Sequence, residues 1–195
     1  MHYRPLGNTG VKVSELCLGT AFRGQDDEQT CIRVIDRALD LGCNFIDSAF
    51  YGQGRSETVV GKTIKDKRED VFLCTKIFGT RHPEPNNSGL TRLNLIRGVE
   101  DSLTRLQTDH IDLYQLHNPK AEALDRDEVF ETLEQLQFEG KIRYFGAALG
   151  PDIGWFEEGE MSMRQRHLDS VQIIYSILEQ EPALEFFPIA EKENI

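Results

Sequence analysis

Cysteine is scarce in this sequence, tryptophan occurs once, and no long apolar run is present. The 195 residues include 4 cysteines, with no C-x-x-C pair and no histidine at the spacing of a metal site. This usage predicts buried free thiols in a reducing compartment rather than a disulfide framework or a metal centre. No apolar run approaches the roughly 20 residues of a membrane span. The first residues lack the apolar segment of a signal peptide, so we expect a cytoplasmic protein.

Positive charge is also in short supply. The chain has 22 lysines and arginines against 33 aspartates and glutamates, which gives a net charge of -11. Such a chain repels phosphate backbones and anionic lipid, so we expect neither nucleic acid nor a membrane as a partner. A bound anionic cofactor remains compatible with this charge, because local N–H groups and a few cations are enough to hold one.

What the sequence does contain is a regular alternation of strand-like and helix-like segments. At this length one domain, residues 1–195, is the default expectation. A turn at residues 7–10 predicts an N-terminal hairpin, and helix caps are expected at Asp26 or Asp27, at Thr91 and at Asp127. Alternation of this kind predicts a parallel sheet covered by helices. The expected strands of that sheet are residues 15–19, 43–47, 71–77, 111–117, 141–148 and 170–176.

Two α/β architectures fit this alternation: an open doubly wound sheet and a (β/α)8 barrel. No G-x-G-x-x-G follows the first expected strand, which disfavours the dinucleotide-binding doubly wound sheet. Polar residues stand at the carboxyl ends of successive strands, where a barrel places its chemistry. The sequence therefore predicts an incomplete (β/α)8 TIM barrel, with about six of eight strand–helix units behind the hairpin.

Three consecutive strands of this barrel end in an unusual way. Asp47 closes the second strand, Lys76 stands near the end of the apolar third, and His117 closes the fourth. A buried ammonium costs several kcal/mol unless it is paired, and the carboxylate of Asp47 on the neighbouring strand offers that partner. A purely structural ion pair is the alternative interpretation. The third polar strand end, together with Tyr51 in the Gly-rich loop after Asp47, favours a functional site.

The residue types of this cluster indicate proton transfer at an oxygen atom. A tyrosine phenol in water keeps its proton up to about pH 10, and a lysine cation beside it favours the phenolate. A histidine can donate a hydrogen bond to an oxygen that gains negative charge. The cluster suits protonation of a carbonyl or deprotonation of an alcohol. Any hydride would come from a cofactor, since no side chain supplies one.

The sequence resembles the aldo-keto reductases over essentially its whole length. The motifs that carry the resemblance are "YRPLGNTGVKVSELCLGT", "NFIDSAFYGQGRSE", "VFLCTKI", "IDLYQLHNP", "GKIRYFG" and "SVQIIYSILEQ". The resemblance implies the (β/α)8 barrel and reduction of an aldehyde or ketone with NADPH, with NAD as an alternative. It implies a catalytic tetrad of Tyr51 as general acid with Asp47, Lys76 and His117. It also implies a cofactor-binding set of Gly19, Thr20, Ala21, Asp47 and Gln172.

The chain departs from the family pattern at several positions. Tyr51 follows Asp47 by four positions where the family has five, so Phe50 is an alternative occupant of the tyrosine's place. The family's Ser-Asn pair after the fifth strand reads Ala148-Leu149. The loops at residues 79–89 and 150–160 are expected to rim the mouth and to set substrate choice.

The seventh and eighth strand–helix units of the family have no counterpart in these 195 residues. We therefore expect a truncated barrel that self-associates through open sheet edges. Leu16 and Leu18 on the first strand, and Val171 and Ile173 on the sixth, are expected to face the barrel interior. A non-catalytic barrel remnant that acts through protein contacts, or has no activity, is the alternative function.

Overall fold

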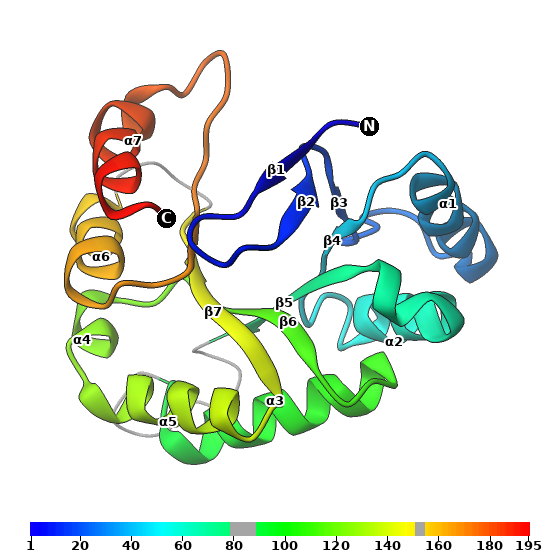
Figure 1. Cartoon of the computed structure of the whole chain (residues 1–195). Helices are drawn as coiled ribbons and strands as arrows, with labels where there is room; N and C mark the ends of the chain where they lie inside the picture. The colour runs from blue at the N-terminus through cyan, green and yellow to red at the C-terminus, as the bar shows by residue number, and fades with distance from the viewer. Residues whose placement is uncertain (79–88, 151–154) are drawn as a thin grey trace.

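The computed structural model describes residues 1–78, 89–150 and 155–195. The chain begins with the predicted antiparallel hairpin of β1 (Tyr3–Pro5) and β2 (Lys12–Ser14). Gly7 and Gly10 both have positive φ, a conformation that costs glycine little and lets the turn reverse the chain. Figure 1 shows this hairpin beside the main sheet, with the chain's C-terminus near its turn.

A six-stranded parallel sheet forms the body of the molecule, in the order β3-β4-β5-β6-β7-β8. Each strand pairs with its neighbour in the sequence, which is the order of a (β/α)8 barrel and confirms that prediction over the doubly wound sheet. Four of the strands are shorter than expected, β8 most of all. The bounds are β3 (Cys17–Gly19), β4 (Phe45–Asp47), β5 (Phe72–Phe78), β6 (Ile111–His117), β7 (Ile142–Ala148) and β8 (Ser170–Gln172).

Helices follow the strands and lie on the outer, convex side of the curved sheet (Figure 1). This arrangement arises because each helix has an apolar face that is buried only when it packs on the sheet. The helices are α1 (Glu28–Asp40), α2 (Arg55–Ile64), α3 (Arg92–Leu106), α4 (Ala121–Leu124), α5 (Asp127–Phe138), α6 (Phe156–Glu160) and α7 (Glu181–Glu193), with a 3₁₀ turn at Lys65–Asp70 and a π-helical turn at Met161–Gln165.

Two of the predicted helix caps are confirmed and one is wrong. Asp27 accepts a hydrogen bond from the Thr30 N–H at 2.9 Å, and Thr91 caps α3 in the same way. Asp127 does not cap α5, because it is already the first helical residue and Arg126 occupies the cap position. The Asp127 carboxylate instead accepts a hydrogen bond of 2.7 Å from Arg166.

The two faces of the sheet bury different sets of side chains. The main core lies between the sheet and the helices, and a smaller cluster of Val13, Phe72, Cys74 and Leu113 fills the barrel interior against the hairpin. The hydroxyl of Tyr144 closes this smaller cluster by donating to the Thr9 carbonyl at 3.0 Å.

The expected inward direction of the edge-strand side chains is wrong for Leu16, Leu18 and Val171. Leu18 and Val171 pack against the core beneath the helices, and Leu16 is 67% exposed. Ile173 packs against the same core but also lines a cavity at the carboxyl ends of the strands. Strand register explains the difference. Gly19 pairs with Asp47, so the side chains of Cys17 and Gly19 lie on the same face of the sheet as Asp47, and that of Leu18 lies on the opposite face. The prediction of buried thiols is likewise wrong for Cys17, which is exposed, and confirmed for the other three cysteines.

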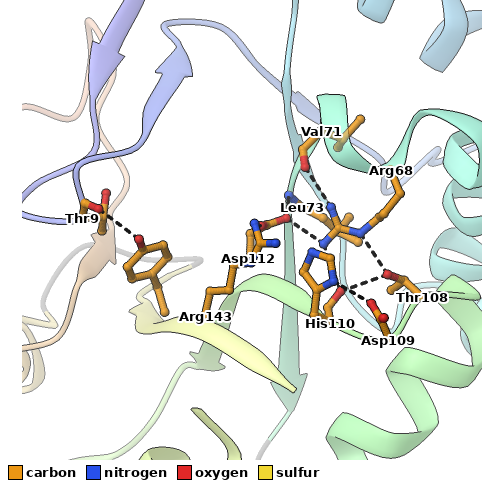
Figure 2. A network of polar contacts seen from close by, with 10 residues as sticks. Thr9, Arg68, Val71, Leu73, Thr108, Asp109, His110, Asp112 and Arg143 are labelled. Carbon is orange, nitrogen blue, oxygen red and sulfur yellow. Dashed lines mark hydrogen bonds and ion pairs between the residues drawn. The ribbon is translucent and has the colours of Figure 1, made fainter. Parts of the chain in front are cut away.

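At the end of the barrel opposite the polar strand ends, one buried aspartate joins three strands (Figure 2). The carboxylate of Asp112 on β6 accepts hydrogen bonds from Arg68 at 2.8 Å and from Arg143 of β7 at 2.9 Å. It also accepts the Leu73 N–H of β5 at 2.8 Å. Hydrogen bonds to an ionised group are stronger than those between neutral groups, so this network helps to hold β5, β6 and β7 together. Among the described residues, no helix is long and apolar enough to cross a lipid bilayer.

Candidate active site

Neighbouring parallel strands bring Asp47 of β4 and Lys76 of β5 into contact. The ammonium of Lys76 donates hydrogen bonds to the Asp47 carboxylate and, at 3.1 Å, to the Ser48 carbonyl. The Lys76 side chain is only 2% exposed and that of Asp47 is 20% exposed. The structure therefore shows the pairing that the sequence predicted for a buried lysine.

The charge on Lys76 depends on this pairing. Burial by itself would lower the pKa of Lys76, but anionic neighbours outweigh burial and raise that pKa above its usual value, and Asp47 is one of them. Burial also raises the pKa of the Cys74 thiol, which is therefore neutral at pH 7. Asp47 is thus the charge that stabilises the ammonium, and Lys76 is a cation near neutral pH.

Tyr51 lies in the loop between β4 and α2. Gly52 and Gly54 both have positive φ, and the Gly54 N–H donates to the Tyr51 carbonyl at 3.2 Å. The neighbouring Phe50 ring lies under the Arg105 guanidinium, 4.9 Å from the carbon of that group to the ring centroid. Tyr51 lines a cavity together with Asp47 and Lys76, whereas Phe50 does not. The shorter spacing after Asp47 therefore leaves the tyrosine at the cavity.

His117 completes the group from the end of β6. Its ring centroid lies 6.5 Å from that of Tyr51, with the two rings nearly perpendicular. Burial, helped by the Lys76 cation, lowers the pKa of His117 to about 4. The imidazole is therefore neutral at pH 7, and a neutral imidazole still has one N–H to donate.

These four side chains line one cavity of about 400 Å³. Gln172 lies there as well, and its amide donates a hydrogen bond of 3.3 Å to the second oxygen of Asp47. The described lining residues are Arg23, Asp47, Tyr51, Lys76, His117, Asn118, Ala148, Leu149, Gly150, Gln172, Ile173 and Ile174.

Three expected cofactor residues, Gly19, Thr20 and Ala21, are not among the lining residues. Thr20 is fully buried, and its hydroxyl lies 2.8 Å from the Ser56 hydroxyl and 3.1 Å from the Asp47 carbonyl. Its N–H also donates to the Asp47 carbonyl at 2.9 Å. In this structure Thr20 holds the end of β4 rather than pointing to the cavity.

The sequence analysis missed the remaining polar residues of the lining, Arg23 and Asn118. Asn118 carried a usable signal, because it directly follows the last residue of a predicted strand. Its φ of 52° is one that asparagine tolerates, and its side-chain oxygen accepts the Gly150 N–H at 3.0 Å. Arg23 carried no such sequence signal, since it lies in a loop. Most of the two loops expected to set substrate choice, residues 79–88 and 151–154, falls outside the described residues.

Comparison with known proteins now decides the family. The sequence model of the Aldo/keto reductase family matches residues 15–195. The chain belongs to the aldo/keto reductase family. The expected resemblance is thereby confirmed, and so is the barrel that it implied.

Two curated relatives from Bacillus subtilis (strain 168) illustrate the similarity. The uncharacterized oxidoreductase YrpG is 38% identical over 97% of this chain and 63% of its own length. The aldo-keto reductase YhdN is 36% identical over 100% of this chain and 60% of its own length. This aldo/keto reductase chain thus spans less than two thirds of the length of either relative.

Solved structures give the same result. The holo form of aldo-keto reductase AKR11C1 from Bacillus halodurans superposes with a TM-score of 0.86 at 38% identity, covering 100% of this chain and 64% of that one. An aldo/keto reductase from Klebsiella pneumoniae, in complex with NADP and acetate, gives a TM-score of 0.80 at 27% identity, covering 97% and 64%.

Proposed function

We propose that the chain carries the proton-transfer site of an oxidoreductase that reduces an aldehyde or ketone to an alcohol with NADPH, or runs the reverse reaction. The observation that supports this is the shared cavity: a tyrosine, a buried lysine–aspartate pair and a neutral histidine line one space of about 400 Å³. Family membership is consistent with this chemistry. We further propose that residues 1–195 act as one catalytic domain.

Each side chain has a distinct role in the proposed reaction. Tyr51 gives its phenolic proton to the carbonyl oxygen, and the Lys76 ammonium stabilises the phenolate that remains. Asp47 keeps that ammonium charged and in position. His117 donates its N–H to the same oxygen as negative charge develops there. The low pKa of His117 suits this role, because a neutral imidazole orients the substrate without competing as a proton donor.

NADPH, when bound, supplies the hydride. Asp47 and Gln172 are the lining residues best suited to hold its nicotinamide end, since a carboxylate accepts from ribose hydroxyls and an amide both donates and accepts. Their contact of 3.3 Å is long, and both side chains reach solvent, so their polar atoms are accessible to a ligand. The NADP complex of the Klebsiella relative supports this cofactor class, with NAD as the alternative.

The proposed reaction is tested by following NADPH oxidation with a series of aldehydes. Tyr51→Phe removes the proton donor, so turnover should fall by about 10²–10⁴-fold, the usual contribution of a positioned general acid. Tyr3→Phe is the matched control, because it removes a phenol hydroxyl at the hairpin, where that hydroxyl binds the Gly42 carbonyl at 2.8 Å. Equal rates for Tyr51→Phe and the unchanged protein would contradict the assignment.

We also infer that this chain associates with itself. Among the described residues, β3 and β8 each have only one neighbour in the parallel sheet, so each presents unpaired backbone groups. This open geometry supports the expectation of self-association through sheet edges.

A further inference from the structure

The loop between β3 and α1 presents Arg23 at the cavity. Phe22 has a φ of 46°, and its side chain packs against the main core. The Gln25 N–H donates to the Phe22 carbonyl at 3.0 Å, which closes a turn with Arg23 at its second position. The partly buried phenyl ring therefore anchors the turn, and the arginine beside it lies among the lining residues.

A second arginine fixes this turn to the Tyr51 loop. Arg55 is the first residue of α2, the helix that follows Tyr51. Its guanidinium donates to the Gln25 carbonyl at 3.0 Å and to the Asp26 carbonyl at 2.9 Å. The position of Arg23 relative to Tyr51 is thus set by hydrogen bonds between the two loops.

Arg23 differs in charge balance from the other ionised lining residues. Lys76 is neutralised by Asp47, whereas none of the ion pairs within 4.0 Å in residues 1–78, 89–150 and 155–195 includes Arg23. This is notable in a chain with 33 acidic and 22 basic residues. A guanidinium at a cavity mouth without an acidic neighbour is available to bind a carboxylate, because its planar shape allows two parallel hydrogen bonds to the two carboxylate oxygens.

We propose that Arg23 binds a carboxylate of the substrate, so that the preferred substrates are aldehydes or ketones that carry a carboxylate. This inference rests on the proposed function, since it places the reacting carbonyl at Tyr51 and His117. The hydrocarbon part of the substrate contacts the apolar lining residues Leu149, Ile173 and Ile174. The carboxylate then reaches Arg23 at the mouth.

The first test compares kcat/KM for 4-carboxybenzaldehyde and 4-methylbenzaldehyde, which differ in charge and little in shape. Arg23→Gln should lower the carboxylate-to-methyl ratio by about fivefold to tenfold, the size expected for an accessible charge-assisted pair. Arg23→Lys should retain part of the ratio. Arg97→Gln is the matched control, because it removes one charge from the exposed face of α3 and should leave the ratio unchanged.

The second test measures binding without turnover. The product-like alcohol 4-(hydroxymethyl)benzoate is titrated against the protein in the presence of NADPH, with Trp155 fluorescence as the signal. Weaker binding to Arg23→Gln, with an unchanged unfolding midpoint, supports the carboxylate site even if no aldehyde is reduced, so the site and the proposed reaction can fail separately. Equal binding to both proteins overturns the proposal. A weakened affinity for NADPH with an unchanged carboxylate-to-methyl ratio also overturns it, because Arg23 would then contact the cofactor.

Discussion

The guanidinium of Arg105 on α3 donates a hydrogen bond of 2.6 Å to the carboxylate of Glu57 on α2, a side chain with no exposure to solvent. The other oxygen of Glu57 accepts the Thr75 hydroxyl of β5 at 2.7 Å. Because Arg105 also covers the Phe50 ring, this one ion pair joins two helices and a strand beneath the loop that carries Tyr51.

Arg105→Met should destabilise the protein by about 3 kcal/mol or more, because it leaves the Glu57 charge buried without its partner. The double variant Glu57→Gln/Arg105→Met should lose less than the sum of the single changes, since it removes both charges. Urea unfolding followed by circular dichroism measures these losses. Arg4→Met breaks a pair whose side chains are 75% and 36% exposed, so it should cost less than about 1 kcal/mol. Similar losses for Arg4→Met and Arg105→Met would contradict this account.

Gly54 should be far less tolerant of alanine than Gly140. Both have positive φ, so each substitution costs about 1–2 kcal/mol in backbone strain. A Cβ at Gly54 would also meet the Arg105 side chain at 2.5 Å and the Phe50 ring at 2.9 Å, whereas one at Gly140 would meet nothing within 4 Å. Thermal unfolding of Gly54→Ala and Gly140→Ala compares the two positions, and equal midpoints would show that the Phe50–Arg105 packing adjusts freely.

The titration midpoint of His117 should lie at a much lower pH than that of an ordinary histidine. Its pKa is lowered from 6.5 to about 4, so the unfolded chain binds a proton at pH values where the folded chain does not. His117 therefore has no effect on stability above about pH 6.5, and it destabilises the fold progressively as the pH falls from 6.5 towards 4. Proton NMR titration of the imidazole signals measures this, with His117→Gln to assign the resonance. A midpoint near 6.5 would contradict the assignment.

The barrel order and the clustering of three polar strand ends were predictable because each depends on short sequence signals. Apolar runs mark the strands, and Asp47, Lys76 and His117 each break such a run at its carboxyl end. Asp112 lies within an apolar strand too, but its partners Arg68 and Arg143 come from distant parts of the chain, so its role was not visible. Long-range pairing of this kind has no local pattern.

The direction of the side chains in the edge strands could not be predicted from the sequence either. Both faces of β3 have a residue that suits a core, Cys17 on one face and Leu18 on the other. Only the register with β4 decides which of the two faces points into the barrel. Arg23 was missed for a related reason. Its place at the cavity depends on Phe22 packing into the core and on Arg55 binding the following carbonyls, and neither contact leaves a recognisable motif.

If the proposed reaction is correct, Lys76→Met should lower NADPH-dependent turnover by about a hundredfold or more, because it removes the cation that is proposed to stabilise the Tyr51 phenolate. The fold should persist, since methionine fills much of the same buried space and Asp47 remains 20% exposed to water. Turnover and circular dichroism are measured together. Lys62→Met is the control, because it removes a lysine from an exposed pair with Glu28. Near-normal turnover in Lys76→Met with an intact fold would show that the lysine is only structural.

The 195-residue chain should form dimers or larger species in solution. The segment after β8 exposes Ile177 by 90% and Leu178 by 93%, and the nearby ring of Tyr175 packs on the half-exposed Phe187 of α7. Each large apolar side chain left in water forgoes on the order of 1.5–3 kcal/mol, so burying this surface beside the open β8 edge favours association. Size-exclusion chromatography with light scattering measures the mass. Ile177→Glu/Leu178→Glu should shift the chain towards monomer, whereas Phe138→Glu, on α5 and 93% exposed, should not. A monodisperse monomer from the unchanged chain would contradict the prediction and show that the sheet edges and this apolar surface are stable in water.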